Sequence, residues 1–436
     1  MTVRANLSRV FSTIFTSNTL LDTRRGVARM RRGSAPGILH YFHQADDPYS
    51  HLAAQTLLPL LQRYRVRLEA HLVPPPDDAA APERARLKRY ALRDAARVAR
   101  RYGLAYPDAA IEPGPAATAA ANAQLAHAIA SNSFVETASA IGAALWRGDS
   151  SNAPAQDEGS TLRIMTEGDA LRRKLGHYLS GMFYFDGEWY WGVDRLHHLE
   201  TRLRTEALVQ DPASSRIAPF QEMTLDGVPA AGTKPTIEFW FSFRSPYSYI
   251  AAPRLHRLAE HYGAEVRWRF ILPMVMRGLP VPRVKSRYIM LDVKREADLL
   301  DIPYGTMVDP RGEGIHRALA VLNHAIQVGK GAAFAESGLA AAFADGIDMA
   351  TNTGLMRTAR RAGLSVSDVE TALADDSWRP IAEENRTALF EAGLWGAPTY
   401  RVNGMAAHWG QDRLWALEED LAAVIASTGH TPVGAA

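Results

Sequence analysis

Large apolar side chains occupy every second position from residue 237 to residue 243. This alternation predicts a β-strand, because successive side chains of a strand point to opposite faces. The apolar spacing over 249–262 predicts a helix, and Gly263 stands where a helix commonly ends. Residues 266–270 alternate again and predict a second strand. Two strands joined by a helix form a βαβ unit, so we expect them to run parallel.

The rest of the C-terminal half predicts a mostly helical segment from 287 to about 390, followed by a hairpin. A strand over 399–402 leads into the Asn-Gly pair at 403–404, which is a strong hairpin signal between strands. An Asp-Gly pair at 186–187 carries the same signal in the N-terminal half. A βαβ unit, a helical insert, a hairpin and a final helix from Gln411 follow one another in the order of the thioredoxin fold.

An internal repeat organises the chain. The segment 47–54 resembles the segment 245–252, at an offset of 198 residues. Such matches are hard to obtain by chance, and the period is far too long for a solenoid. The other matching residues are Tyr90, Asp94 and Arg97 with Tyr288, Asp292 and Arg295, and Trp191 to Leu196 with Trp409 to Leu414. We interpret the chain as a tandem duplication whose second copy carries an insertion between about 349 and 392.

The repeat predicts four parts. They are a basic helical extension over 1–35, a first α/β domain over 36–213, a linker over 214–234 and a second α/β domain over 235–428. The extension carries seven arginines against one acid, Asp22. We interpret it as an amphipathic helix packed on the body of the protein, with contact to a membrane surface and a targeting sequence as the alternatives.

The composition excludes several classes of function. The 436 residues include 49 basic and 47 acidic ones, for a net charge of +2, so the positive excess typical of nucleic-acid-binding proteins is absent. No apolar run approaches the ~18 residues of a membrane span and no clear secretory signal is present, so we expect a cytoplasmic protein that is not integral to a membrane. The chain has no cysteine, which excludes disulfides, thiolate metal ligands, a cysteine nucleophile and intrinsic dithiol–disulfide chemistry.

The second copy resembles the 2-hydroxychromene-2-carboxylate isomerase and kappa-class glutathione transferase branch of the DsbA-like thioredoxin folds. The segments that carry the resemblance are Phe243 to Tyr249, Lys285 to Arg295, Trp395 to Tyr400 and Trp409 to Leu414. The resemblance covers nearly all of 235–428. It implies an α/β fold of two tandem thioredoxin-like (DsbA-type) domains, each a mixed central sheet with an inserted helical subdomain. The first copy shares the order of predicted elements with the second but lacks these motifs, and we interpret it as degenerate.

Ser245 stands where the first strand meets the first long helix, the place of the redox cysteine in a thioredoxin fold. A hydroxyl at a helix N-terminus cannot cycle a disulfide, but it can donate a hydrogen bond to a foreign thiolate and favour the ionised thiol. Lowering a thiol pKa by ~2 units takes only ~2.7 kcal/mol. The resemblance assigns this catalytic role to Ser245, with glutathione supplying the thiol. The alternative for Ser245 is an ordinary N-cap. We interpret Ser248 as a residue of capping or packing.

The resemblance also implies four residues that bind glutathione. Ala397 and Pro398 are expected to form a cis peptide beside the active helix, where the preceding backbone pairs with the cysteinyl residue of glutathione; alone, they would read as an ordinary turn. Gln411 and Asp412 stand at a helix start, where the family receives the γ-glutamyl end. The alternative for Asp412 is a first-turn acid that complements the helix dipole and pairs with Arg413.

Four further residues are candidates for binding the substrate, a small aromatic or unsaturated electrophile. Arg277 follows the second strand and suits a carboxylate, with a solvated loop charge as the alternative. Lys285 lies in the segment that borders the substrate cleft in relatives, and Tyr247 lies in the serine motif. Trp395 either walls an apolar pocket or packs in the core. His408 is an acid–base candidate by residue type alone.

The first copy departs from the second at the same positions. Asp47 stands in the place of Ser245, and the segment 180–182 replaces Ala397, Pro398 and Thr399. A carboxylate beside a thiolate raises the thiol pKa, so we expect no glutathione thiolate here. We interpret this copy as a support that pairs with the second copy within the chain, in the place of the second subunit of a family dimer, and a homo-oligomer is compatible with this. We predict no metal site, because His43, Asp46 and Asp47 lack further ligand spacing.

Two hypotheses of function follow. The first is a glutathione-dependent isomerase or transferase, in which the thiolate adds to the electrophile and then leaves again or stays. The second is a non-catalytic binding or scaffold protein that keeps the thioredoxin cleft for peptides or protein partners.

Overall fold

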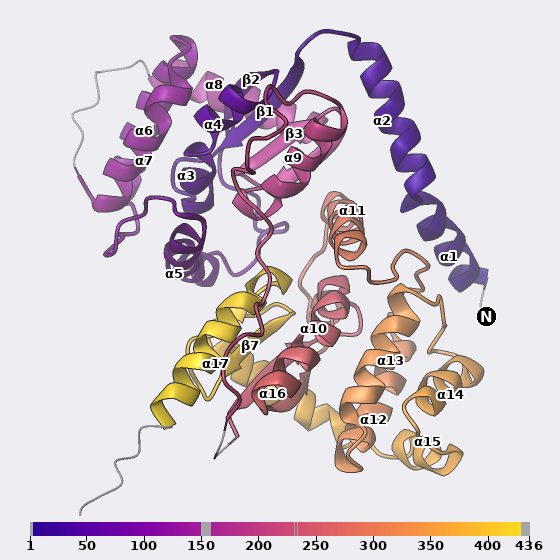
Figure 1. Ribbon diagram of the computed structural model, residues 1–436. Coiled ribbons are helices and arrows are strands. Elements are labelled where there is room, and N and C mark those ends of the chain that lie inside the picture. Colours follow the sequence, from indigo (N-terminus) through magenta and orange to yellow (C-terminus); the bar gives the residue numbers. More distant parts are fainter. Residues whose placement is uncertain (1–2, 150–157, 231, 233, 429–436) are drawn as a thin grey trace, which may run out of the picture. The chain divides into compact units, whose positions relative to one another are not determined.

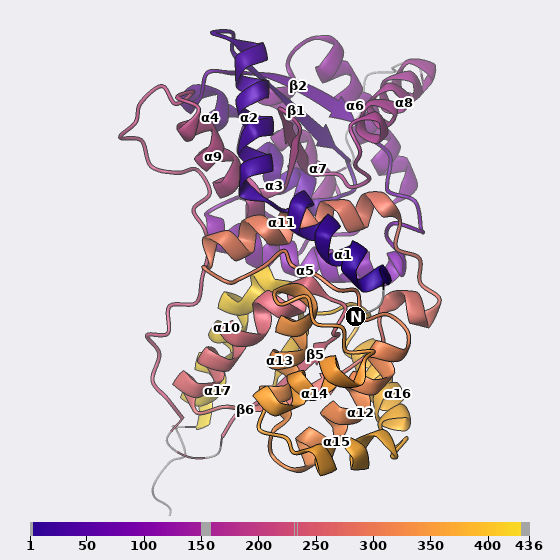
Figure 2. The same cartoon turned by 90° about the vertical axis from the view of Figure 1, so that its right-hand side faces the viewer.

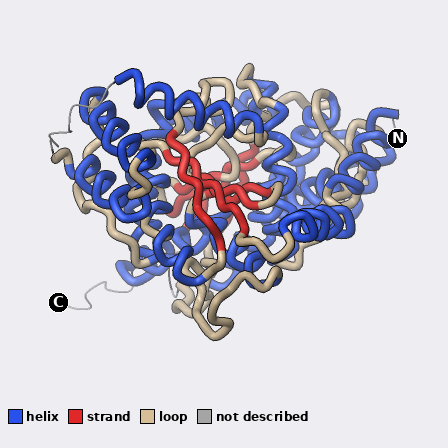
Figure 3. The backbone as a smooth tube through the Cα atoms, turned by 90° about the horizontal axis from the view of Figure 1, so that it is seen from above, coloured by secondary structure: helices blue, strands red, loops and turns tan. Residues whose placement is uncertain are grey.

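The computed structural model describes residues 3–149, 158–230, 232 and 234–428; residues 231 and 233 of the predicted linker and the first two residues of the predicted extension lie outside it. The chain divides into two compact units (Figure 1). The C-terminal unit comprises Met1–Leu20, Gln221–Val281 and Ile289–Ala436, and the N-terminal unit comprises Leu21–Phe220 and Pro282–Tyr288. Each unit contains one four-stranded sheet, whose strands lie among helices (Figure 3).

The C-terminal unit has the strand order β6-β5-β7-β8. β5 (Thr236–Phe241) and β6 (Glu265–Phe270) are parallel and are joined by α10 (Pro246–Tyr262), so the predicted βαβ unit is confirmed. β7 (Thr399–Val402) pairs antiparallel with β5, and β8 (His408–Trp409) pairs antiparallel with β7. The sheet is therefore mixed, as expected.

The sequence around α10 fixes both of its ends. The Ser245 side chain accepts a hydrogen bond from the backbone of Ser248, which satisfies one of the N–H groups that a helix start leaves unpaired. Pro246 takes the first helical position, where its missing N–H costs nothing. Gly263 ends the helix in the left-handed conformation, at a φ of +66°. Ser245 is thus the N-cap of α10, four residues after the end of β5.

The N-terminal unit has the corresponding strand order, β2-β1-β3-β4. β1 (Gly37–His43) and β2 (Val66–Leu72) are parallel, β3 (Met182–Phe185) is antiparallel to β1, and β4 (Glu188–Trp191) is antiparallel to β3. Order and directions agree with those of the C-terminal unit, as the repeated motifs predict. The duplication of an ancestral domain stays a prediction.

In each unit, several helices lie between the second and the third strand along the chain, that is, between β2 and β3 and between β6 and β7. Figure 2 shows α12 to α15 gathered at one end of the C-terminal unit. The connecting helices are α5 (Arg84–Tyr102), α6 (Pro115–Ala130), α7 (Phe134–Arg147) and α8 (Glu158–Lys174) in the first half, and α11 (Arg283–Leu299), α12 (Glu313–Gln327), α13 (Gly331–Phe343), α14 (Asn352–Arg361), α15 (Val366–Leu373) and α16 (Trp378–Glu391) in the second half. The short helices α3 (Pro48–Ala54) and α4 (Leu57–Arg63) join β1 to β2, and α9 (Leu196–Thr205) and α17 (Leu414–Thr428) end the two halves. None of the helices described here has both the length and the apolar character that a bilayer span needs.

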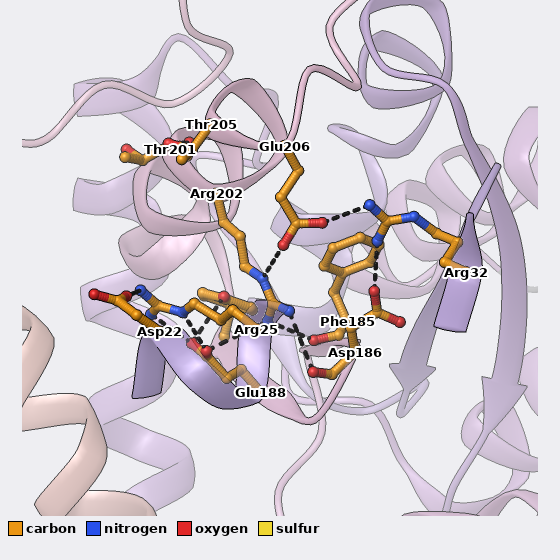
Figure 4. A network of polar contacts seen from close by, with 11 residues as sticks. Asp22, Arg25, Arg32, Phe185, Asp186, Glu188, Thr201, Arg202, Thr205 and Glu206 are labelled. Atoms are coloured by element: carbon orange, nitrogen blue, oxygen red, sulfur yellow. Dashed lines mark hydrogen bonds and ion pairs between the residues drawn. The ribbon is translucent and has the colours of Figure 1, made fainter. Parts of the chain in front are cut away.

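The basic N-terminal segment forms α1 (Val3–Phe15) and α2 (Asn18–Arg32). Arginines of α2 pair with acids of the N-terminal unit, in a network that Figure 4 shows. The Arg25 guanidinium lies 2.6 Å from Glu188, and Arg32 lies 2.5 Å from Asp186 and 2.6 Å from Glu206. These contacts explain why the segment is rich in arginine, since the hairpin and α9 present the matching acids.

The helix α1 belongs to the C-terminal unit, although more than 200 residues of sequence separate the two. The Ser12 hydroxyl accepts a hydrogen bond of 2.9 Å from the backbone N–H of Met307, and Ser12 is almost fully buried. A Cβ added to Gly305 would lie only 2.4 Å from the hydroxyl oxygen of Thr16. The segment around Gly305 and Met307 is therefore fitted closely to α1.

Candidate active site

The hydroxyl of Ser245 makes two hydrogen bonds at the start of α10. It accepts one of 3.1 Å from the backbone N–H of Ser248, and it donates one of 3.1 Å to the carbonyl oxygen of Ala397. Ser245 itself is half-buried. The structure therefore brings together Ser245 and Ala397, which are 152 residues apart in the chain.

The peptide bond between Ala397 and Pro398 is cis, which confirms the expectation from the sequence. The following residues are held tightly, since the Thr399 hydroxyl donates to Gly396 O at 2.9 Å and the Gly410 N–H donates to Pro398 O at 3.0 Å. Within the part of the chain that the structure describes, the N–H of half-buried Ala397 has no hydrogen-bond acceptor. Ala397 thus presents an N–H and a carbonyl beside the helix N-terminus.

A second hydroxyl lies next to Ser245. Ser248 is fully buried, and its side-chain oxygen has no hydrogen-bond partner among the described residues. A buried hydroxyl without a partner carries a desolvation cost of about 1–3 kcal/mol. The serine motif therefore combines one hydroxyl that caps α10 with one that is buried and unsatisfied.

Gln411 lies in a buried polar network rather than in the open. Its side-chain carbonyl accepts a hydrogen bond of 2.6 Å from Arg254, and its amide donates to Glu296 at 2.8 Å and to Asp412. Arg254 also lies 2.7 Å from the carboxylate of Glu222. The Gln411 side chain is thus fully occupied by the protein, and Asp412 is the half-buried member of the pair predicted to bind the γ-glutamyl end.

Arg277 is the predicted substrate residue with unsatisfied groups. It ends a short 3₁₀ turn (Met274–Arg277) and donates one hydrogen bond of 2.9 Å to the carbonyl of Trp395. Its Nε and Nη1 are buried without a partner in the described part of the chain. Burial and, to a smaller extent, the charge of Arg386 lower the pKa of Arg277 to about 10. A cation with two idle N–H groups is suited to receive an anion.

Tyr247 is placed differently from the expectation that it contacts substrate. Its hydroxyl donates a hydrogen bond of 2.7 Å to buried Asp292, which also lies 3.0 Å from Arg295. In the N-terminal unit, Tyr49 donates to Asp94 at the same distance of 2.7 Å. The same contact at both places favours a scaffold role, in which the tyrosine fastens the first turn of the long helix.

Trp395 is buried, and its ring lies 4.8 Å from the ring of Trp409. A Cβ at Gly396 would lie 2.7 Å from the indole nitrogen of Trp409, so a side chain at position 396 would displace the Trp409 ring. This packing supports the core alternative for Trp395. His408 is also buried, with its Nε2 2.8 Å from the carboxylate of Asp420.

Comparisons with known proteins agree with this geometry. Residues 236–422 match the model of the DsbA-like thioredoxin domain. The 2-hydroxychromene-2-carboxylate isomerase of Pseudomonas sp. (strain C18) is 30% identical over 190 residues, which cover 42% of this chain and 88% of that protein. The chain belongs to the family of this isomerase. The isomerase of Pseudomonas putida is 29% identical over 190 residues, which cover 42% of this chain and 92% of that protein.

A solved structure of 2-hydroxychromene-2-carboxylate isomerase is 25% identical, covers 45% of this chain and 99% of that one, and aligns with a TM-score of 0.39. The DsbA-like thioredoxin domain of the isomerase family thus occupies the C-terminal half of this chain. The degeneracy of the first half stays a prediction.

Lys285 belongs to the N-terminal unit, whereas the other candidates belong to the C-terminal unit. Its ammonium donates a hydrogen bond of 2.9 Å to the carbonyl of Ala80. Burial lowers the pKa of Lys285 to about 8. The role of Lys285 in substrate binding stays a prediction.

The counterpart of the isomerase-family site in the N-terminal unit is filled by its own side chains. Asp47 caps α3 and accepts hydrogen bonds from Tyr49 N (3.2 Å), Ser50 N (3.0 Å) and the hydroxyls of Ser50 (2.7 Å) and Ser180 (3.0 Å). Burial raises the pKa of Asp47, although these hydrogen bonds oppose the shift. The cis proline is replaced by Gly181, at a φ of +63°. The carboxylate of Asp47 is therefore already hydrogen-bonded by residues of its own unit.

Sequence reasoning missed the partners of two site residues. The sequence analysis does not single out Arg254, although it directly follows the apolar run from Ile250 to Pro253 and becomes buried in α10. A charged residue inside an apolar helix face is the available signal, because such a group needs a partner. The two Arg277 nitrogens without a hydrogen-bond partner in the described structure could not be predicted from the sequence, because their pairing depends on which distant side chains pack nearby.

Proposed function

We propose that the C-terminal unit is a glutathione-dependent isomerase or transferase that acts on a small aromatic or unsaturated electrophile, with Ser245 stabilising the thiolate of glutathione. The observation that carries this proposal is the position of the Ser245 hydroxyl, at the N-terminus of α10 and 3.1 Å from the carbonyl of Ala397. A partial positive charge and a hydroxyl donor meet there, and both favour a thiolate over a thiol.

Glutathione can bind at this site if the Ser245 hydroxyl changes its hydrogen-bond acceptor. The Ser245 hydroxyl has one hydrogen, which now goes to Ala397 O. When that hydrogen turns to the sulfur, the carbonyl of Ala397 becomes available for the cysteinyl N–H, and the idle N–H of Ala397 for the cysteinyl carbonyl. Ser245 keeps its acceptor role toward Ser248 throughout. A tripeptide backbone thus pairs with Ala397 as one strand pairs with another.

The chemistry needs no group beyond the thiolate and the substrate. The sulfur forms a bond to an unsaturated carbon, and the displaced electron pair moves onto the conjugated carbonyl oxygen. Rotation about the resulting single bond is then free. When the electron pair returns, the double bond forms again in the other geometry and the thiolate leaves; if a proton is taken up instead, the conjugate remains. The names of the relatives favour the first outcome, an isomerase.

Arg277 supplies a site for a carboxylate on the electrophile. Its unpaired Nε and Nη1 are buried near the segment that carries Ala397, through its hydrogen bond to Trp395 O. The relatives are named for a substrate that is itself a carboxylate. An aromatic carboxylate is therefore the substrate class that this chain suits best, with Arg277 fixing its orientation and the sulfur reaching its double bond.

The test compares glutathione with S-methylglutathione, which keeps the tripeptide but has no ionisable thiol. We expect glutathione to raise the melting temperature of the full chain and the bound thiol to titrate about 2 units below free glutathione, by its ultraviolet thiolate absorbance. Ser245→Ala should abolish this pKa shift and lower the rate of isomerisation about 30-fold, which is the ~2 kcal/mol of a charge-assisted hydrogen bond.

Ser365→Ala is the matched control, because Ser365 is also an N-cap serine, on α15, and its loss costs a similar ~1 kcal/mol of stability. It should leave the thiol pKa unchanged. If Ser245→Ala binds glutathione and the bound thiol has the same lowered pKa as in the wild type, Ser245 has no part in the chemistry. If glutathione does not bind at all, the scaffold hypothesis is favoured.

A further inference from the structure

The sheet of the N-terminal unit carries two imidazoles and a carboxylate on one face. His40 lies on the central strand β1, and Glu69 and His71 lie two positions apart on the edge strand β2. His40 is paired in register with Glu69, and Phe42 with His71. The three side chains thus point to the same face, because residues that alternate along a strand share a side.

The ligand atoms of these residues converge. The Nδ1 of His40 lies 3.0 Å from the Nε2 of His71 and 3.3 Å from the Oε2 of Glu69, and the three atoms all lie within 4.8 Å of one another. With metal–nitrogen bonds of about 2.0–2.1 Å, two ligands of a tetrahedral ion stand about 3.3 Å apart. The observed separations around His40 are close to that value before any ion is bound.

We propose that His40, Glu69 and His71 form a binding site for a divalent transition-metal ion of the zinc type, with water completing its coordination. Two imidazoles and one carboxylate are ligands that Zn²⁺ and its neighbours accept. All three residues are half-buried, so solvent reaches the site and the ion has a path of entry.

The rings are held in place by aromatic neighbours. His71 stacks on Phe42 with ring centroids 4.8 Å apart, and His40 lies 5.9 Å from the ring of Tyr184. Such support orients the ligand nitrogens and lowers the ordering cost of binding. The edge strand β2 would then be tied to β1 by the ion as well as by backbone hydrogen bonds.

The C-terminal unit has a different arrangement on the corresponding face. Glu238 on β5 lies there between Arg269 and Arg401, and both guanidiniums make ion pairs with its carboxylate. Cations fill that face and exclude a metal ion. The histidine cluster is therefore specific to the N-terminal unit and does not follow from the resemblance of the two halves.

One feature of the site opposes metal binding. The Arg67 guanidinium lies 2.8 Å from the Oε1 of Glu69, while Oε2 faces His40. Arg67 is two-thirds exposed and contributes a positive charge near the ion. Removing this charge should strengthen the affinity for a cation, which distinguishes a metal site from a simple contact between two imidazoles.

The test uses tag-free, chelator-treated full chain and calorimetric titration with Zn²⁺. The wild type should bind one zinc equivalent that His40→Ala and His71→Ala each lose, and zinc should raise the melting temperature of the wild type but not of these two variants. Glu69→Gln should bind about 10-fold more weakly, and Arg67→Gln about 5-fold more tightly. His127→Ala, which removes an exposed histidine of α6 in the same unit, should bind like the wild type.

The substitutions Glu69→Gln and Arg67→Gln, at a half-buried and an exposed position, keep the test valid if a histidine variant fails to fold, and melting in metal-free buffer identifies such a failure. Equal zinc binding by the wild type, Glu69→Gln and both histidine variants would overturn the proposal. Absence of zinc binding by the wild type would do the same and assign the cluster to an imidazole–imidazole hydrogen bond.

Discussion

At the scale of single residues, the buried Arg254 and the half-buried Arg277 of the C-terminal unit differ in how their guanidiniums are paired. Arg254 is paired with Glu222 and with the side chain of Gln411. Arg277 has a single hydrogen bond to a carbonyl, and two of its nitrogens are buried without partners in the described structure. An unpaired buried donor is a cost to folding unless a ligand uses it. The difference is consistent with a structural role for Arg254 and with the carboxylate subsite that we propose at Arg277.

Replacing Arg277 by methionine should therefore leave the free protein within about 1 kcal/mol of the wild type, because the lost hydrogen bond is offset by the removal of two unsatisfied donors. The KM for a carboxylate-bearing substrate should rise about 30-fold or more, since a buried charge pair is lost. Urea unfolding and steady-state kinetics measure the two effects.

Arg254→Met provides the comparison. It leaves Glu222 without its cation and Gln411 without a donor, so it should cost about 3–5 kcal/mol of stability. If both variants lose stability equally while KM stays constant, Arg277 is a structural residue and the carboxylate subsite is wrong.

At the scale of elements, each unit fastens the first turn of its crossover helix in the same way. Tyr247 of α10 donates to Asp292 of α11, and Tyr49 of α3 donates to Asp94 of α5. The two contacts join the helix after the first strand to the first helix of the insert. The helix α10 is thus held at its N-terminal end by a contact that does not involve the hydroxyl of Ser245.

Tyr247→Phe and Tyr49→Phe should each lower the free energy of unfolding by about 1–3 kcal/mol, because a buried carboxylate loses a donor. Neither change should move the pKa of the bound glutathione thiol. Thermal unfolding and the thiolate titration check these outcomes. A shift of that pKa in Tyr247→Phe alone would return Tyr247 to the ligand site, as the sequence predicted.

The sequence predicted those elements whose signals are local. The alternation from 237 to 243, the glycine after α10 and the Asn-Gly pair at 403–404 correspond to β5, to the end of α10 and to the turn after β7. The cis bond before Pro398 followed from the resemblance and is confirmed. The partners of Gln411 and the contact of Lys285 with the carbonyl of Ala80 had no local signal, because both depend on how distant segments pack.

At the scale of the whole molecule, the two units differ in the hydrogen-bonding groups that remain available where the first helix follows the first strand. The Ser245 hydroxyl has a single hydrogen that can change its acceptor, and the N–H of Ala397 is idle in the described structure. Asp47 at the corresponding place accepts four hydrogen bonds from its own unit. The proposed thiolate site at Ser245 therefore differs from the corresponding place in the N-terminal unit, where the carboxylate of Asp47 is already hydrogen-bonded by its own unit.

We accordingly expect one glutathione per chain in calorimetric titration. Asp47→Ser should not add a second equivalent, because Ser180 and Gly181 stand where the C-terminal unit has Ala397 and Pro398. The same change should destabilise the N-terminal unit by about 1–3 kcal/mol through the lost hydrogen bonds. Two equivalents of glutathione on the wild type would contradict the assignment of the first half to support.

The burial of Ser12 against Met307 affects the choice of boundaries for a fragment that contains the C-terminal unit. A cut at the sequence boundary between the halves would give a fragment from residue 221 onward that retains Ser245, Ala397 and Arg277 but has no α1. The N–H of Met307 and the backbone around Gly305 would then face water where a helix had covered them. A fragment meant to report on the active half has to include the first 20 residues, joined or added in trans.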